Sequence, residues 1–192
     1  MKSVVSRHIG LMCFFILASF GSNAQIVHID PAGDGGFNTG TSLALNNWTT
    51  NNVAGQNTFW ACGGAPWASI TNRAAFITQT GLNYNNSLSA NRVAHMWRPI
   101  TVPAGNSIIN LSFLWKCEGA GVNDRMRVYA VPNTYTPVWG TQMSPTYTPV
   151  GLANYSGQAT WTTANITLPA SLAGTTFKLV FEWVNNGLGP NG

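Results

Sequence analysis

The chain has 192 residues, a formal net charge of +4 and only 7% charged residues. Its basic residues stand alone or in the loose pair Arg125 and Arg127. They offer no run along which a phosphate backbone could lie, so no nucleic-acid partner is expected. With so little charge, Asn, Thr, Ser and Gly must form most of the surface, which is common in exported β-proteins and argues against a cytosolic helical enzyme.

A signal peptide is predicted at residues 1–24. A basic start precedes an apolar run over residues 9–20, and small residues lead to a cleavage site after Ala24. The run is shorter than the roughly 20 apolar residues that a transmembrane helix needs, and polar sequence follows it at once. We therefore expect a secreted or cell-surface protein whose mature chain, residues 25–192, has no membrane span.

The mature sequence shows repeated period-two alternation and no convincing helical stretch. Turns rich in Gly, Pro and Asn separate the alternating segments. In chain order, strands are predicted at residues 57–62, 74–78, 92–100, 109–117, 125–130, 161–168 and 177–183. Short strands at this spacing predict one all-β domain over residues 25–192, a two-sheet antiparallel β-sandwich of jelly-roll type.

Residues 134–156 interrupt the pattern with three prolines, which remove donors from a strand ladder, so a long loop or an edge is predicted there. Long loops on a rigid sandwich often bind ligands. Aromatic rings in this segment and in one earlier turn can stack on a sugar or a protein partner, and the alternative is packing within the loops. The candidate contact residues are Trp67, Trp139, Tyr147 and Tyr155.

No residue set suited to catalysis is evident. His28 lies beside the processing site and His95 lies in a strand-like run, and neither has a second histidine at metal-ligand spacing. Glu118 and Asp124 flank a glycine turn and resemble the polar rim of a loop more than an acid/base pair. The glycines of residues 33–36 lack the preceding strand and following helix of a phosphate cradle. We predict that the chain is not an enzyme and that it needs no cofactor.

Two cysteines remain after processing, Cys62 and Cys117. In an oxidising compartment they can form a disulfide, and the alternative is two separate buried thiols. Neither cysteine has the close spacing of a zinc knuckle.

Eight short segments stand in a characteristic order. They are residues 34–40 (DGGFNTG), 47–49 (NWT), 59–60 (FW), 74–77 (AAFI), 110–116 (NLSFLWK), 124–132 (DRMRVYAVP), 161–169 (WTTANITLP) and 179–183 (LVFEW). Together they resemble the jelly-roll domains called choice-of-anchor J or cleaved-adhesin type, which are similar to eukaryotic MAM domains. Such domains recur in large surface and secreted proteins of Gram-negative bacteria that use type IX secretion, often beside peptidase, fibronectin-like or sorting domains.

The resemblance also implies a structural calcium ion near Asp34, Asn38 and Asp124. Members of the family commonly have Glu where this chain has Asn38, and they end in a further strand that carries an Asp-Asn pair. Loss of these acids removes negative charge that calcium requires, which argues against occupancy. The sequence stops at Gly192 before such a strand, so the resemblance implies a truncated domain that lacks its last strand.

These observations predict a non-catalytic, exported cell-surface module for adhesion, with an extracellular glycan or protein as its ligand. The alternative is an ancillary domain of a secreted peptidase or glycosidase whose catalytic part lies outside this chain. The fold class by itself does not separate the two functions.

Overall fold

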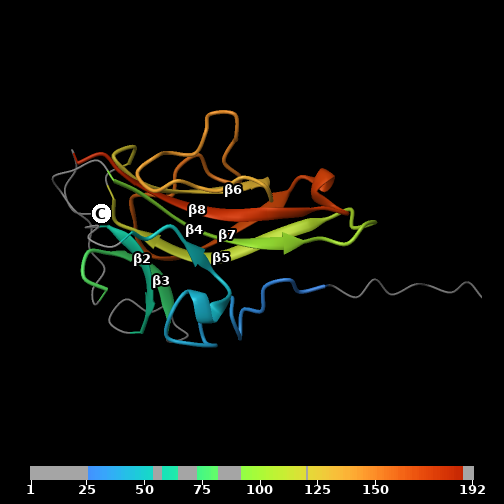
Figure 1. Ribbon diagram of the computed structural model, residues 1–192, viewed down its shortest axis with the longest axis horizontal. Coiled ribbons are helices and arrows are strands. Elements are labelled where there is room, and N and C mark those ends of the chain that lie inside the picture. Colours follow the sequence, from blue (N-terminus) through green and yellow to red (C-terminus); the bar gives the residue numbers. More distant parts are fainter. Residues whose placement is uncertain (1–25, 54–57, 65–72, 82–91, 120, 188–192) are drawn as a thin grey trace, which may run out of the picture.

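The computed structural model describes residues 26–53, 58–64, 73–81, 92–119 and 121–187, and the predicted signal peptide lies outside them. The described part consists of strands, loops and two single-turn helices (Figure 1). In chain order the elements are η1 (Ala44–Asn46), β1 (Thr49–Thr50), β2 (Phe59–Gly63), β3 (Ala74–Thr78), β4 (Arg92–Thr101), β5 (Ile109–Cys117), β6 (Asp124–Pro132), β7 (Gln158–Leu168), η2 (Ala170–Leu172) and β8 (Thr176–Asn185).

The strands form two layers. One layer is a four-stranded antiparallel sheet in the order β1-β4-β8-β6, which we call sheet A. The facing layer consists of two separate antiparallel pairs, β2–β3 and β5–β7, and Figure 1 shows the β2–β3 pair apart from the other. From β4 to β8, successive strands alternate between the layers. The predicted all-β antiparallel sandwich is therefore confirmed.

The strands begin and end close to where the alternation of side chains predicts them. β3 and β5 have the predicted bounds, and β4 and β8 are longer by one to three residues. The two-residue strand β1 was not predicted, because it is too short for a periodic pattern. Its position follows from its pairing with Trp97 and Met96 of β4.

Aromatic side chains of both layers fill the core. Phe181 of β8 makes edge-to-face contacts with Trp48 and with Phe113 of β5, with ring centroids 5.7 and 5.2 Å apart. Trp60 of β2 donates its indole N–H to the carbonyl of Ala94 on β4 at 3.2 Å, which joins the β2–β3 pair to sheet A. Each aromatic pair is worth about 0.5–1.5 kcal/mol beyond the apolar area that it buries.

A salt bridge anchors the glycine-rich N-terminal loop to sheet A. Asp34 Oδ2 lies 3.0 Å from Arg98 Nη1 on β4 and accepts a hydrogen bond from Asn47 Nδ2 at 2.9 Å. The Arg98 guanidinium also lies over the Trp48 ring, 5.7 Å from its centroid. Burial alone would raise the pKa of Asp34, but the Asn47 hydrogen bond and the Arg98 charge outweigh it, so this pKa is lowered.

A cavity of about 960 Å³ lies between the layers. Its lining includes consecutive residues of β5 (109–116) and of β3 (74–77), but a single residue of β2, Trp60. Side chains alternate between the two faces of a strand, so contact with consecutive residues means that the cavity follows strand edges. Since β3 pairs with β2 and β5 with β7, the edges that face the cavity have no strand partner among the described residues.

Four apolar side chains of β8 are buried and also line this cavity. They are Phe177, Leu179, Phe181 and Trp183. Protein interiors are normally close-packed, with few voids larger than a water molecule. At this cavity the described side chains of the two layers therefore leave space between them.

We predict that the mature chain aggregates or melts at low temperature when expressed alone, because unpaired strand edges recruit other chains. Leu114 is 40% exposed in the middle of β5. Leu114→Lys should slow aggregation measured by light scattering, because an edge lysine opposes edge-to-edge pairing. Leu152→Lys places the same charge on a loop and should leave the rate unchanged. A mature chain that stays monomeric and melts as high as a form extended by one alternating strand would contradict this prediction.

Candidate functional site

Three charged or titratable side chains lie side by side on the face of sheet A that points away from the sandwich core. The register pairs His95 of β4 with Glu182 of β8, and Glu182 with Arg127 of β6. Directly opposed residues on one face of a sheet have their side chains in contact. The strand pairing itself thus assembles a His–Glu–Arg row.

The carboxylate of Glu182 is the centre of this row and has no exposed surface. It accepts hydrogen bonds from two neighbouring strands and from a loop. The donors are His95 Nε2 (3.2 Å), Arg127 Nε (2.9 Å), the Tyr129 hydroxyl (3.5 Å) and the Met143 backbone N–H (2.5 Å), and Arg127 Nη2 lies 2.6 Å away as an ion pair. A buried carboxylate that is bonded in this way retains its charge.

Asn51 determines which ring nitrogen of His95 carries the proton. The Asn51 side-chain oxygen accepts the His95 backbone N–H at 3.0 Å, so the Asn51 amide nitrogen is the donor to His95 Nδ1 at 2.9 Å. Nδ1 is therefore an acceptor, and the proton of the neutral ring lies on Nε2 and points to Glu182. Because His95 is fully buried, its imidazole is a structural link rather than a base that a substrate could reach.

The loop between β6 and β7, residues 133–157, folds over this face of sheet A. Its backbone N–H groups at Gly140 and Met143 donate to Val93 and Glu182, and Lys178 Nζ donates to the Tyr135 carbonyl at 2.6 Å. Beneath the loop lies a second apolar cluster. Its buried members are Trp97, Tyr129, Val131, Met143 and Val180, with Tyr135 and Tyr147 packed against it.

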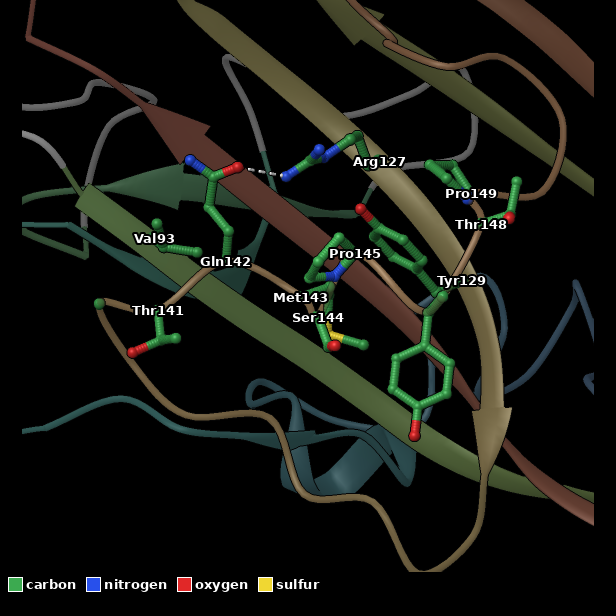
Figure 2. A pocket seen from close by; sticks show the side chains of 12 residues that line it. Val93, Arg127, Tyr129, Thr141, Gln142, Met143, Ser144, Pro145, Thr148 and Pro149 are labelled. Carbon is green, nitrogen blue, oxygen red and sulfur yellow. Dashed lines mark hydrogen bonds between the residues drawn. The ribbon is translucent and has the colours of Figure 1, made fainter.

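A pocket of about 730 Å³ lies between this loop and sheet A, and Figure 2 shows it from close by. Its volume falls within the range of about 300–1,000 Å³ that is typical of small-molecule sites. Arg127 and Tyr129 form the sheet side, with Gln142 opposite Arg127 at 2.7 Å. The lining residues are Val93, Arg127, Tyr129, Gly140, Thr141, Gln142, Met143, Ser144, Pro145, Tyr147, Thr148 and Pro149.

The network shifts the pKa values of its members. Burial alone would raise the pKa of Glu182, but the His95 and Met143 hydrogen bonds and the Arg127 charge outweigh it, so this pKa is lowered. Burial, together with the Glu182 charge, raises the pKa of the Tyr129 hydroxyl. At neutral pH the Tyr129 side chain that lines the pocket is thus neutral, whereas the buried Glu182 beside it is ionised.

The predicted contact residues occupy different environments. Tyr147 lines the pocket and makes an edge-to-face pair with Tyr135, with centroids 5.0 Å apart. Trp139 is half-buried against the main core, and its buried indole N–H has no hydrogen-bond partner among the described residues. Tyr155 is 1% exposed and packs on Trp115 at 5.0 Å, so it is a core residue and offers no ring to a ligand. Trp67 lies outside the described residues.

The remaining titratable candidates do not come together as an active site. Glu118 pairs with Lys116 at 2.8 Å, whereas Asp124 points into the protein and is 1% exposed. Both carboxylate oxygens of Asp124 lack a hydrogen-bond partner among the described residues, and burial raises its pKa. Within the part of the chain that the structure describes, no three His, Cys, Asp or Glu side chains cluster as metal ligands would.

The three residues associated with calcium lie apart. Asp34 contacts Arg98, whose partner on β8 is Leu179, whereas Asp124 is paired with Asn185. These two positions on β8 are separated by about 20 Å at the rise of a β-strand. Asn38 directs its side-chain amide to the Ala32 carbonyl. The structure therefore does not bring Asp34, Asn38 and Asp124 together, and Asp34 forms an ion pair with Arg98 instead. The expectation that calcium is not bound stays a prediction.

Both cysteines are free thiols in the structure. Cys62 is half-buried and Cys117 is buried. Burial raises the pKa of both, that of Cys117 to about 11.

Comparison with known proteins gives a distant structural neighbour. No family model and no curated protein sequence matches the chain. Among solved structures, the chain is similar to the K1 cleaved adhesin domain of Lys-gingipain from Porphyromonas gingivalis W83. The sequence identity is 18% and the TM-score 0.42, over 72% of this chain and 87% of that one. This likeness is distant and does not by itself assign a function.

Among the described residues, no helix is long and apolar enough to cross a membrane.

We predict that Glu182→Gln destabilises the fold by about 3 kcal/mol, because removing one partner of a buried ion pair leaves the other uncompensated. Urea unfolding at pH 7 measures this loss, and Glu118→Gln, at a half-exposed pair, is the control. Because the pKa of Glu182 is lowered on folding, its contribution is complete above the unfolded value of 4.5 and is lost as pH falls through the lower folded value. The destabilisation by Glu182→Gln should therefore shrink at acid pH, and a pH-independent difference would contradict this assignment.

We also predict that a thiol-reactive probe labels both cysteines of the unfolded, unreduced mature chain. In the folded chain Cys117 should react far more slowly than Cys62, because it is buried and little of it is thiolate near neutral pH. Mass spectrometry after labelling distinguishes the two sites. Absence of label at both sites in the unfolded, unreduced chain would show that they form a disulfide.

Proposed function

We propose that this chain is a non-catalytic binding module of an exported protein, and that it contacts an extracellular glycan or protein through the pocket between sheet A and the loop of residues 133–157. The observation that supports this most directly is the state of the ionisable groups there. Glu182 and His95 are fully buried and are used to hold the loop on the sheet. Neither is positioned to exchange a proton with a substrate.

The remaining lining suits recognition. The hydroxyl-bearing residues Thr141, Ser144 and Thr148 line one pocket together with Gln142 and Tyr147. Hydrogen-bonding groups beside an aromatic ring are the combination that binds a sugar, because the polar groups orient its hydroxyls and the ring packs on its apolar face. Sheet A, on which the pocket rests, is rigid through its long strands. A rigid scaffold with a binding loop is a common arrangement for recognition.

We expect the mature chain to retain glycans on an array without releasing reducing ends, peptides or alcohols from model substrates. Tyr147→Ala should reduce retention about tenfold, since loss of one stacking ring costs on the order of 1–1.5 kcal/mol. Trp161→Ala, at a half-buried ring on the opposite layer, is the matched control and should bind normally. Turnover that depends on His95 or Asp124 would contradict the proposal. Equal binding by the Tyr147→Ala variant and the wild-type protein would also contradict it.

A further inference from the structure

Two guanidinium groups share one neutral acceptor at the edge of the pocket: Arg127 and Gln142 line the pocket, and Arg125 lies beside it in contact with Gln142. Arg125 and Arg127 are two residues apart on β6, so both project from the same face. Gln142 Oε1 accepts from Arg127 Nη2 at 2.7 Å and from Arg125 Nη2 at 3.4 Å. Two like charges at this spacing repel each other, and an amide oxygen compensates this repulsion only weakly.

The acidic side chain beside Arg127, that of Glu182, already has its hydrogen-bond partners. Glu182 binds Arg127 but is fully buried and bonded to four different residues. The charge of Arg125 is not paired with any carboxylate in the described chain. Its guanidinium donates hydrogen bonds to the Val122 carbonyl and to Gln142. The side chain of Asp124, the adjacent acid, points to the opposite face of β6, toward the core. The rim therefore has an excess of positive charge.

The hydrogen-bonding groups at the rim are mostly donors, which also favours a negatively charged ligand. Because Gln142 directs its oxygen to the two arginines, its NH₂ group points away from them, as Figure 2 shows. Arg127 uses Nε and Nη2 for Glu182 and Gln142, and no partner of its Nη1 is found among the described residues. The rim thus presents several donors and no free charged acceptor, which suits an oxyanion.

We infer that the rim formed by Arg125, Arg127 and Gln142 binds the carboxylate of an acidic sugar, such as a uronic acid, whose ring enters the pocket beside Tyr147. This inference rests on the proposed function, because it names the class of glycan for the same site. A carboxylate between the two guanidinium groups relieves their repulsion and forms charge-assisted hydrogen bonds. The hydroxyl-bearing loop residues then bind the remaining sugar hydroxyls.

The test is calorimetric titration of the mature chain with a hyaluronan hexasaccharide and with the same hexasaccharide after reduction of its carboxyl groups to alcohols. We expect the acidic form to bind at least about tenfold more tightly, and its affinity to fall as salt is raised, because the contact is charge-assisted. Arg125→Gln should lower the affinity for the acidic form about tenfold and leave the affinity for the reduced form unchanged. This substitution spares the Glu182 network, so the fold is retained.

Lys116→Gln is the matched control, because it removes one positive charge from the opposite layer of the sandwich. Lys116→Gln should leave the affinity unchanged. A loss of affinity with Lys116→Gln equal to the loss with Arg125→Gln would show a non-specific charge effect and overturn the inference. Equal binding of the acidic and reduced forms, or binding on the array of neutral glycans only, would also overturn it and leave the proposed function standing. Absence of binding to every glycan and protein tested would reject both.

Discussion

The outer face of sheet A depends on one buried carboxylate, that of Glu182. Transferring a carboxylate from water into a protein costs several kcal/mol unless partners replace its hydration. Here β4 and β6 supply a histidine and an arginine, and the loop supplies a backbone N–H. The loop is therefore held on the sheet by the same group that joins three strands. Any ligand in the pocket binds to a surface whose geometry this charge maintains.

The sequence predicts most of the sandwich but little of the site. In β8 the alternation correctly places Phe181 and Trp183 on the core face and Glu182 on the opposite face. Periodicity identifies a face without showing what covers it, and Glu182 is covered by Met143 from a loop 39 residues away in sequence. A charged residue in a strand normally indicates a face that is exposed to solvent. The full burial of Glu182 results from tertiary contacts that no local pattern encodes.

Tyr155 shows the same limit of sequence-based prediction, because it was expected in an exposed loop and is buried in the core. It follows three prolines, which remove donors from a strand ladder and are typical of a loop or an edge. In the structure its backbone N–H and carbonyl form a bridge with Met126, and its ring enters the core against Phe113 and Trp115. An irregular segment thus contributes one core residue through two long-range hydrogen bonds. The position of the loop between β6 and β7 was predictable, whereas the roles of its individual aromatic residues were not.

The pairing of β4 with β8 has a consequence for how the chain folds. This central pair of sheet A joins His95 to Glu182, which are 87 residues apart in sequence. Contacts this distant incur a large loop-closure entropy, and proteins dominated by them fold slowly. The centre of sheet A cannot form until residues 176–185 have been synthesised, because β8 separates β4 from β6. Until β8 has been made, β4 and β6 each keep an unpaired edge, so the nascent chain carries strand edges that can recruit other chains during the synthesis of residues 133–175.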